Sequence, residues 1–330
     1  MELTVIHKKL IQRLSDGQYY SGKQLALELG ISRTSVWNSL KKLEDLGIEL
    51  HAVKGKGTRL AEPLELLDKR QVLDGVSLDI SGILSRLDVL DCTPSTNAYL
   101  VQQSRLRKID NGTVCLAEMQ TAGKGRLGRA WVSPFAQNVY ISFVWNFKTG
   151  VGALSGLSLA CGAAVCKALQ KMGLSEHKLK WPNDILFEGK KLAGILVEIQ
   201  GESQDEYTAV IGIGVNCHMT SPLTKKIDQP WVDLKAAMPN HPVSRNELAA
   251  ELINQVLPVL SAYESQGLKP SLKYWDDYDG CKNKKIRIIS GKNFSTGIAK
   301  GITEFGELKL LNDAGDIELI SSGEVSLRLE

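Results

Sequence analysis

Features of metal-binding, redox-active and membrane-spanning proteins are scarce in this sequence of 330 residues. The six cysteines lie far apart and form no Cys-x-x-Cys pair, which argues against a zinc site and against a thioredoxin-like motif. The five histidines do not show the spacing of metal ligands either. We therefore expect buried, reduced thiols and no protein-bound metal.

Long apolar segments are equally scarce. Charged residues interrupt the apolar positions of the N-terminal stretch MELTVIHKKLIQRL, so it does not resemble a secretory signal. The strongest candidate for a membrane span is the uncharged run between Lys148 and Lys167, but glycine and serine dilute it, whereas a spanning helix needs about 20 predominantly apolar residues. The run predicts a buried helix of small residues, and we expect the chain in the cytoplasm, with no membrane partner.

A large excess of one charge sign is absent from the chain as a whole, which excludes a histone-like polycation. Lys and Arg number 40 against 37 Asp and Glu, giving a net charge of +3. Residues 1–60, however, hold ten basic and six acidic residues and so carry +4, while the other 270 residues, with 30 basic and 31 acidic, carry −1. Such an asymmetry suggests that the N-terminal segment binds nucleic acid.

The basic segment has the pattern of a winged helix-turn-helix. Apolar spacing and closing glycines predict helices over 4–16, 23–29 and 33–46, and a glycine-rich turn at 54–57 predicts a hairpin. The third helix of such a fold reads base edges, for which Arg and Asn are suited, and the wing contacts phosphates. A helical dimerisation or protein-docking module is the alternative. The predicted DNA-binding residues are Ser32, Arg33, Thr34, Ser35 and Asn38 of the third helix, with Lys54 and Lys56 of the wing.

The rest of the chain predicts two further units. A linker helix is expected from Pro63 to Leu73, interleaved strand and helix patterns follow over about 78–275, and short strands alone occupy 280–330. The expected fold is α+β with three domains: a winged helix over 1–63, a mixed α/β domain over 64–276 and a small β-barrel over 277–330.

The sharpest chemical signal is the stretch Gly-Lys-Gly-Arg-Leu-Gly-Arg at 123–129, with three glycines and three cations in seven positions. Glycines let a backbone approach a ligand closely, and cations bind phosphate or carboxylate, so this loop should hold an anion. It also satisfies G-x-G-x-x-G, but Pro134 and an acid-free strand at 138–147 argue against a dinucleotide fingerprint. A solvated basic hairpin loop is the alternative.

Two weaker signals follow this loop. Lys180, in Lys-Trp-Pro-Asn-Asp, is expected at the end of a short strand, where it could bind a carboxylate or an α-phosphate, although an isolated lysine of this kind usually lies on the surface. Gly194, Gly212 and Gly214 fall inside strand patterns and would leave room for a flat ligand on one sheet face, with ordinary strand packing as the alternative.

Taken in order along the chain, these residues resemble the biotin–protein ligases. Ser95-Thr96-Asn97, the glycine loop, Lys-Trp-Pro-Asn-Asp, Lys-Leu-Ala-Gly-Ile-Leu-Val-Glu and Gly-Ile-Gly-Val-Asn follow one another. With the winged helix in front and Gly-Glu-Val-Ser-Leu-Arg near the end, the chain is similar to the bifunctional bacterial biotin ligases that also repress the biotin operon. The resemblance implies an SH3-like C-terminal barrel and a two-step reaction: biotin and ATP give biotinyl-5′-AMP, whose biotin then passes to a lysine of a biotin carboxyl carrier protein.

The resemblance also assigns roles to residues, with Arg126 and Lys180 as the catalytic pair. The implied biotin-binding residues are Ser95, Thr96, Asn97, Gln120, Gly123, Lys124, Arg126, Lys180 and Gly194. The implied nucleotide-binding residues are Arg126, Arg129, Trp131, Asn183, Asn216 and Arg328. Lys124 and Leu127 stand where a repressor of this family carries arginines, so the retention of the intermediate could differ.

The resemblance further implies partners and regulation. Mg²⁺ would accompany ATP, and the adenylate-bound form would dimerise through the central sheet and bind a palindromic operator. Two other functions are kept as alternatives: a lipoate or other acyl ligase with a DNA-binding domain, and a regulator that senses a ligand without catalysis. The set Arg126, Arg129, Lys180 and Asn216 speaks against a pure sensor, which has no need of a phosphate-stabilising site.

Overall fold

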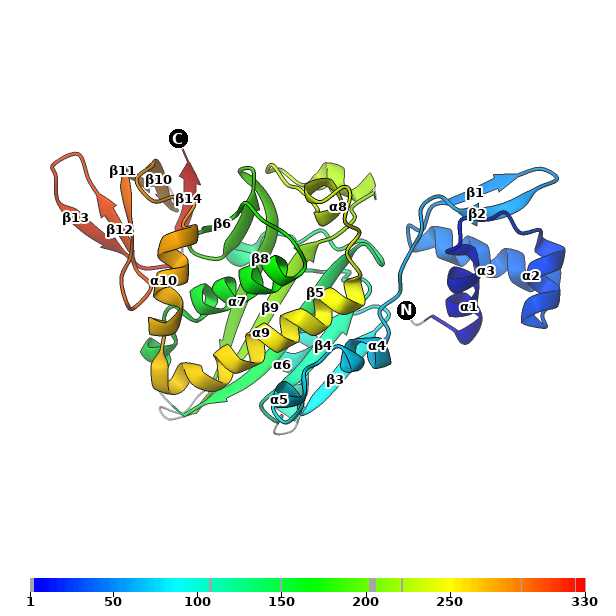
Figure 1. Ribbon diagram of the computed structural model, residues 1–330, viewed down its shortest axis with the longest axis horizontal. Helices are drawn as coiled ribbons and strands as arrows, with labels where there is room; N and C mark the ends of the chain where they lie inside the picture. The colour runs from blue at the N-terminus through cyan, green and yellow to red at the C-terminus, as the bar shows by residue number, and fades with distance from the viewer. Residues whose placement is uncertain are drawn as a thin grey trace.

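Three structural units follow one another along the chain: a small N-terminal helical unit, a central unit around a large sheet, and a smaller C-terminal sheet (Figure 1). The computed structural model describes residues 3–106, 109–148, 150–201, 206–220, 222–291, 293–323 and 325–329. The N-terminal and C-terminal units lie at opposite ends of the central unit, which therefore connects them.

The N-terminal unit is the predicted winged helix-turn-helix. The side chains of Thr4, Ser21 and Ser32 cap its three helices, and glycine ends the second one. Its elements are α1 (Val5–Leu14), α2 (Gly22–Leu29), α3 (Arg33–Asp45), β1 (Leu50–Val53) and β2 (Gly57–Leu60). The order of helices and hairpin is the predicted one, because caps and closing glycines are local signals that the sequence displays directly.

The central unit contains a seven-stranded sheet of order β3-β4-β5-β9-β8-β7-β6. Strands β3 and β4 run parallel, and the other neighbouring strands run antiparallel. The strands are β3 (Arg86–Leu90), β4 (Thr113–Ala117), β5 (Asn138–Phe147), β6 (His177–Lys180), β7 (Asp184–Phe187), β8 (Lys190–Gln200) and β9 (Tyr207–Asn216). The helices are α4 (Lys69–Asp74), α5 (Leu78–Ser81), α6 (Thr96–Leu106), α7 (Leu157–Lys171), α8 (Leu234–Ala237), α9 (Arg245–Gln266) and α10 (Lys269–Tyr278).

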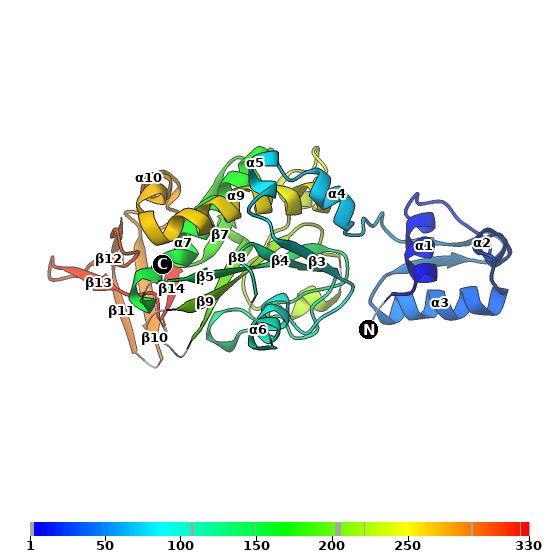
Figure 2. The same ribbon diagram turned by 90° about the horizontal axis from the view of Figure 1, so that it is seen from below.

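Helices cover both faces of this sheet, with α7 and α9 on one side and α6 on the other (Figure 2). Alternate residues of the strands supply the two hydrophobic layers, because side chains along a strand point to opposite faces. Cys115, Val144 and Val210 are buried in the cluster beneath α6, whereas their neighbours Val114 and Phe143 belong to the main core. The sheet is thus buried on both faces.

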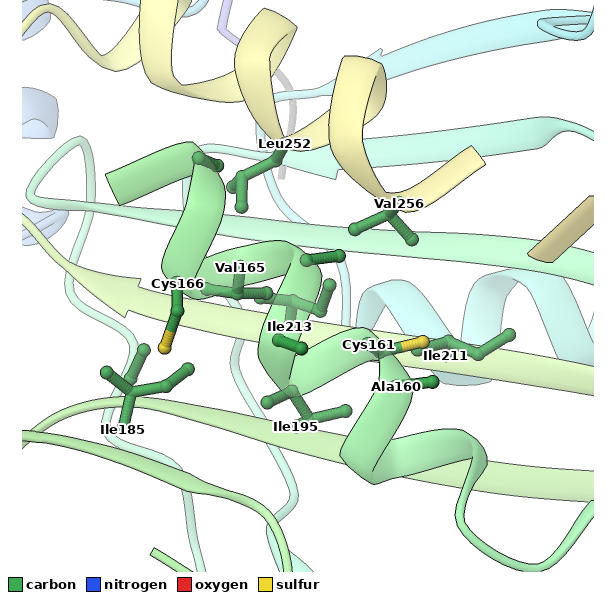
Figure 3. Packing of buried hydrophobic residues seen from close by; sticks show 14 of the residues in the cluster. Ala160, Cys161, Val165, Cys166, Ile185, Ile195, Ile211, Ile213, Leu252 and Val256 are labelled. Carbon is green, nitrogen blue, oxygen red and sulfur yellow. The ribbon is translucent and has the colours of Figure 1, made fainter. Parts of the chain in front are cut away.

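The uncharged run between Lys148 and Lys167 contributes the helix α7, as the small-residue pattern predicts. Figure 3 shows α7 between Leu252 and Val256 of α9 and the sheet residues Ile195 and Ile213. Gly162 lies on the face of α7 that packs on the sheet, where a Cβ would meet the Leu179 side chain at 3.4 Å, an ordinary van der Waals distance. Within the described part of the chain, no helix is both long and apolar enough to cross a membrane.

The C-terminal unit is a five-stranded antiparallel sheet of order β13-β12-β11-β10-β14. Its buried residues join the main core of the central unit, and Trp181, next to the predicted Lys180 site, donates a hydrogen bond of 3.0 Å from Nε1 to the carbonyl of Gly306. The C-terminal sheet is therefore attached to the segment that carries Lys180. Its strands are β10 (Lys285–Ser290), β11 (Asn293–Ile302), β12 (Leu308–Leu311), β13 (Ile317–Ile320) and β14 (Val325–Leu329).

The prediction of a linker helix from Pro63 to Leu73 is wrong over most of its length. Residues 63–68 are not helical, and α4 begins at Lys69. The cause is a set of partners far along the chain: Arg245 donates to the carbonyl of Glu65 at 2.6 Å, and the carboxylate of Glu118 accepts from the backbone N–H of Leu67 at 2.5 Å. The linker is thus held as an extended strip against the central unit.

A buried ion pair lies at the centre of this arrangement. The guanidinium of Arg245, 5% exposed, lies 2.7 Å from the carboxylate of Glu118, 2% exposed, and also donates to the carbonyl of Asn138 at 3.0 Å. Burial alone would lower the pKa of Arg245, but the Glu118 carboxylate raises it. The pair connects the end of β4, the start of β5, the start of α9 and the linker.

The winged helix also contacts the central unit directly. The carboxylate of Asp91 accepts from the backbone N–H of Leu3 at 2.8 Å and forms an ion pair of 2.8 Å with Lys8. Phe135 and Ala136 of the central unit are buried in the hydrophobic core of the winged helix. Two independent contacts, besides the linker, therefore fix its orientation.

The six cysteines are free thiols, as predicted. Five of them are buried, and Cys92 is half-buried. Burial raises the pKa of Cys161, Cys217 and Cys281 to about 12, so these groups stay protonated and unreactive at neutral pH.

We predict that Glu118→Gln lowers the free energy of unfolding by about 3–5 kcal/mol, since it leaves a buried guanidinium without a counter-charge. The amide also has one acceptor atom where the carboxylate accepts from both Arg245 and Leu67. Urea denaturation measures the change. Asp74→Asn is the control, because its partner Arg70 is 91% exposed and 3.9 Å away, and it should change the unfolding midpoint very little. Equal effects of both variants would contradict a structural role for the buried pair.

Candidate active site

A cavity of about 350 Å³ opens where the central sheet, the glycine loop and the C-terminal sheet meet. One wall is the glycine-containing face of β8 and β9, and a second is the loop around 124–132. Met219, the stretch from Lys226 to Trp231 and β14 close the remaining sides. The size is that of a pocket for a small organic ligand.

The glycine loop is a tight hairpin rather than the start of a helix. Gly125 N donates to the carbonyl of Arg129 at 2.7 Å, and Trp131 N donates to the carbonyl of Gly123 at 2.9 Å. Gly123 is buried, and a Cβ there would lie 2.6 Å from the carbonyl of Trp131, so no larger residue fits without a shift. At Gly128 the backbone φ is +70°, a conformation that favours glycine. The loop thus needs glycine for its own shape.

Arg126, at the tip of this loop, bridges to the C-terminal sheet. Its guanidinium donates to the carbonyls of Ser322 and Gly323, the latter at 2.7 Å, and lies 3.4 Å from Oδ1 of Asn183. Burial lowers the pKa of Arg126, while the nearby carboxylate of Asp184 acts in the opposite direction. The guanidinium has neutral carbonyls as acceptors here, and an anionic ligand would bind it more strongly than they do.

The room that Gly194 and Gly214 leave on the sheet face is filled by the indole of Trp131. A Cβ at Gly214 would lie 2.5 Å from Cε2 of Trp131, and one at Gly194 would lie 3.1 Å from its Cζ3. The flat group on this face is therefore a side chain of the chain itself. Nε1 of Trp131 is buried without a hydrogen-bond partner among the described residues, and a Cβ at Gly214 would lie 2.7 Å from it.

Opposite the loop, polar side chains form a continuous network. Oε1 of Gln120 accepts from the backbone N–H of Thr96 at 2.9 Å, and Oγ of Ser142 lies 2.6 Å from both Oγ1 of Thr96 and Oδ1 of Asn97. The Asn97 amide donates to the carboxylate of Glu198 at 2.7 Å. Because these bonds engage the Asn97 amide, it positions its neighbours in the cavity wall.

Gly212 serves this network. A Cβ there would lie 2.4 Å from Oδ1 of Asn97, so the glycine makes room for that amide. At each of the three strand glycines, another side chain of the protein occupies the space that a side chain would take. Asn97 occupies it at Gly212, and Trp131 occupies it at Gly194 and Gly214.

Lys180 and Lys191 both lie near the carboxylate of Asp184 in the cavity wall. Lys180 ends β6, as predicted, and burial lowers its pKa, while Asp184 acts in the opposite direction. Nζ of Lys191 lies 2.7 Å from Oδ1 of Asp184 and 5.2 Å from the centre of the Trp131 ring. A lysine that follows a hairpin turn looks solvent-exposed from the sequence, and for this reason Lys191 is missing from the predicted site.

The structure brings most of the predicted ligand-binding residues together. All of those assigned to biotin, nucleotide or catalysis line the cavity, except Gly123, which is buried at the base of the loop. Asn216 is 4% exposed, and its amide donates to the carbonyl of Val232 at 3.1 Å, so it holds the segment beside the cavity in place. The sequence reasoning missed this segment, which lines the cavity with Met219, Lys226, Ile227, Asp228, Gln229 and Trp231.

The predicted DNA-binding residues lie in the winged helix, away from the cavity (Figure 1). Arg33, Thr34 and Asn38 are exposed on α3, and Lys54 and Lys56 are exposed in the hairpin turn. The remaining two, Ser32 and Ser35, are also exposed, and Ser32 caps the helix because its hydroxyl accepts from Ser35 N at 3.1 Å.

Comparison with protein families gives three matches along the chain. Residues 89–216 match the biotin/lipoate A/B protein ligase family, residues 7–59 match a helix-turn-helix domain, and residues 283–328 match the biotin protein ligase C-terminal domain. The three matches follow the three structural units.

Full-length relatives share this organisation. The chain is 39% identical over 328 residues to the bifunctional ligase/repressor BirA of Escherichia coli strain K12, with 99% of each chain covered. It is 29% identical to the protein of the same name from Bacillus subtilis, over 98% of this chain and 99% of that one. The solved structure of a biotin protein ligase from Aquifex aeolicus with biotin and ATP aligns with a TM-score of 0.63 at 28% identity, covering 74% of this chain and 100% of that chain.

We predict that Gly214→Ala displaces the Trp131 indole and lowers the free energy of unfolding by about 1–3 kcal/mol, as overpacking does. Gly82→Ala is the matched control, because a Cβ at Gly82 meets nothing within 4 Å. Thermal unfolding and tryptophan fluorescence measure the two effects. If Gly214→Ala changes neither relative to Gly82→Ala, the indole does not rest on this strand.

Proposed function

Because the chain belongs to the family of bifunctional biotin–protein ligases and repressors, we propose that its cavity joins biotin to AMP and that Arg126 and Lys180 carry the chemistry. The membership follows from 39% identity over nearly the whole length of a ligase/repressor and from matches to all three domains. The chain is therefore a biotin–protein ligase with a helix-turn-helix repressor domain. The roles of individual residues, the identity of the carrier protein, the metal ion and the oligomeric state are proposals.

The charge of the cavity lining carries this proposal. Seven cationic side chains line it against two carboxylates, in a chain whose total charge is nearly balanced. The cationic residues are Lys124, Arg126, Arg129, Lys180, Lys191, Lys226 and Arg328, and the acidic ones are Asp184 and Asp228. In the first step a biotin carboxylate oxygen attacks the α-phosphorus of ATP, and the bond to pyrophosphate breaks. Both reactants are anions, so fixed cations reduce their repulsion and stabilise the charge of the transition state.

We assign the polar network to biotin and the cationic side to the nucleotide. Ser95, Thr96 and Gln120 offer hydroxyl and amide groups for the ureido ring, and Lys180 at the junction faces both the carboxylate and the α-phosphate. Lys191, unforeseen from the sequence, joins Lys180 there, because it pairs with Asp184 in the same wall. We assign Trp131 and Arg328, which also line the cavity, to the nucleotide.

In the second step a lysine amine of the carrier attacks the carbonyl carbon of the adenylate. The acyl–oxygen bond breaks and AMP leaves with the negative charge, which Arg126 and Lys180 stabilise. We propose the biotin carboxyl carrier protein as the acceptor.

Magnesium is proposed as a companion of ATP rather than as a resident of the protein. Among the described residues, no group of three or more His, Cys, Asp or Glu side chains is arranged to hold a metal ion. Mg²⁺ is commonly bound by one or two carboxylates together with substrate phosphates; Asp184, which is paired with Lys191, and Asp228 are the carboxylates that line the cavity.

For regulation, we propose that the adenylate-bound chain forms a homodimer and binds a two-fold symmetric operator in the cytoplasm. Two-fold proteins read two-fold DNA sites, and the exposed polar face of α3 supplies the base contacts. The intermediate then serves as corepressor, so that synthesis of biotin falls when the carrier is fully biotinylated.

Incubation of the full chain with biotin and α-labelled ATP tests the ligase proposal. We expect labelled biotinyl adenylate and unlabelled pyrophosphate. When the carrier is added, biotin should pass to its lysine and labelled AMP should be released. Product with lipoate but not with biotin would make the chain a lipoate ligase. Absence of product with either acid would make it a sensor without catalysis.

The pH dependence of the first step tests the role of Lys180. Burial lowers the pKa of its ammonium, so the charge is lost as the pH rises through a value below the usual lysine range, and adenylate formation should fall there. Lys180→Arg should be slower, about tenfold, but should lose this alkaline decline, because a guanidinium stays charged. Lys178→Arg, at an exposed position of the same strand, is the control. An alkaline decline that persists in Lys180→Arg would assign it to another group.

A further inference from the structure

The exposed side of α3 carries a large apolar residue that the fold does not use. Thr34, Trp37, Asn38 and Lys41 recur at helical spacing on the solvent side, while Val36 faces the core. Trp37 is 61% exposed. Among the described residues, the hydrophobic cluster of the winged helix does not include it. An exposed tryptophan on a polar helix face indicates a contact surface.

One neighbour holds the ring in place. Nζ of Lys41, one turn further along the helix, lies 5.5 Å from the centre of the Trp37 ring, within the range of a cation–π contact. The ammonium limits the positions that the indole can take, so less freedom is lost when a partner binds. The indole ring of Trp37 is therefore held in one orientation, next to the positive charge of Lys41.

The surroundings select DNA as the partner. Between Arg33 and Lys42 the helix α3 carries three cations and no acid, and the wing adds the exposed Lys54 and Lys56. A protein partner that buried the indole would also have to neutralise these charges, whereas a phosphate backbone does so directly. Position agrees with charge, because Trp37 lies one turn after Arg33 and next to Asn38 in the middle of the face that enters a major groove.

We propose that Trp37 determines sequence specificity by packing its indole on the C5-methyl group of a thymine, while Lys41 binds a neighbouring phosphate. In the major groove the thymine methyl is the apolar group that separates T·A from the other pairs. Each half-site of a two-fold operator would then require thymine at one position. This inference rests on the proposed repressor function and adds a residue to the predicted DNA-binding set.

The test starts by enriching duplexes from a random DNA library with the full chain, biotin and ATP. Binding of the enriched duplex is then measured for wild type, Trp37→Ala and Trp37→Phe over a range of salt concentrations. Trp37→Ala should bind about tenfold more weakly, as for the loss of one base-pair contact, with an unchanged salt slope and unchanged affinity for random duplex. Trp37→Phe should retain part of the affinity.

Replacing single thymines by deoxyuridine, which removes only the methyl group, locates the contact. One replacement per half-site should weaken the wild type several-fold and leave Trp37→Ala unaffected. Leu27→Ala is the matched control, because Leu27 is 83% exposed on α2 and should bind like the wild type. Adenylate formation, which does not involve Trp37, verifies that the ligase unit is folded, and unchanged affinity for random duplex verifies that the winged helix is folded.

The outcomes separate this inference from the repressor proposal. If the wild type enriches no duplex, the chain is not a DNA-binding repressor and both fail. If the wild type binds its duplex but Trp37→Ala binds equally well, or responds to deoxyuridine as the wild type does, the thymine contact is wrong and the repressor stands. A change confined to self-association in Trp37→Ala would make the ring a protein contact and would also overturn the inference.

Discussion

The buried ion pair between Glu118 and Arg245 is the constraint on which the arrangement of this molecule depends. Glu118 follows β4 and precedes Gln120 of the polar network, while Arg245 begins α9 and reaches the carbonyl of Asn138 at the start of β5. The same two side chains bind the backbone of the linker. Since a buried charge without its partner is costly, the elements that meet here must form together. The cavity wall and the attachment of the winged helix therefore both depend on this ion pair.

The cavity shows how local charge can differ from the charge of a whole protein. The whole chain has a net charge of only +3, but seven of the nine charged side chains that line the cavity are cationic. The cations come from the glycine loop, from the ends of β6 and β14, from the start of β8 and from the segment with Lys226, so no short stretch of sequence reveals their number. Their proximity is a product of the topology, in which the central strands run antiparallel and the C-terminal sheet closes the edge.

The helices and hairpin of the winged unit could be predicted from the sequence because their signals are local. Ser21, Ser32 and Gly30 mark helix ends within a few residues of the structure they determine. The linker could not be predicted, since the backbone around Glu65 is held by Arg245, 180 residues later. A leucine-rich segment reads as a helix when that partner is unknown.

The candidate site divides in the same way. The glycine loop and Lys180 stand out through composition and through resemblance to a family. Lys191 does not, because its burial depends on Asp184 and on the Trp131 ring packed beside it. The strand glycines suggest an open face, but the sequence does not say that Trp131 and Asn97 occupy it. Packing between distant residues is the information that a local pattern lacks.

The extended linker has a consequence for evolution of the DNA site. Residues 65–67 are bound to the central unit and Asp91 is bound to the first helix, so these contacts set the orientation of the recognition helix relative to the ligase unit. In the homodimer that we propose, joined through the ligase units, the distance between the two recognition helices would be set by an enzyme surface far from DNA. A substitution that shifted the dimer contact would change the spacing between the two DNA half-sites that the protein can bind. The spacing in the promoter would then have to change with it.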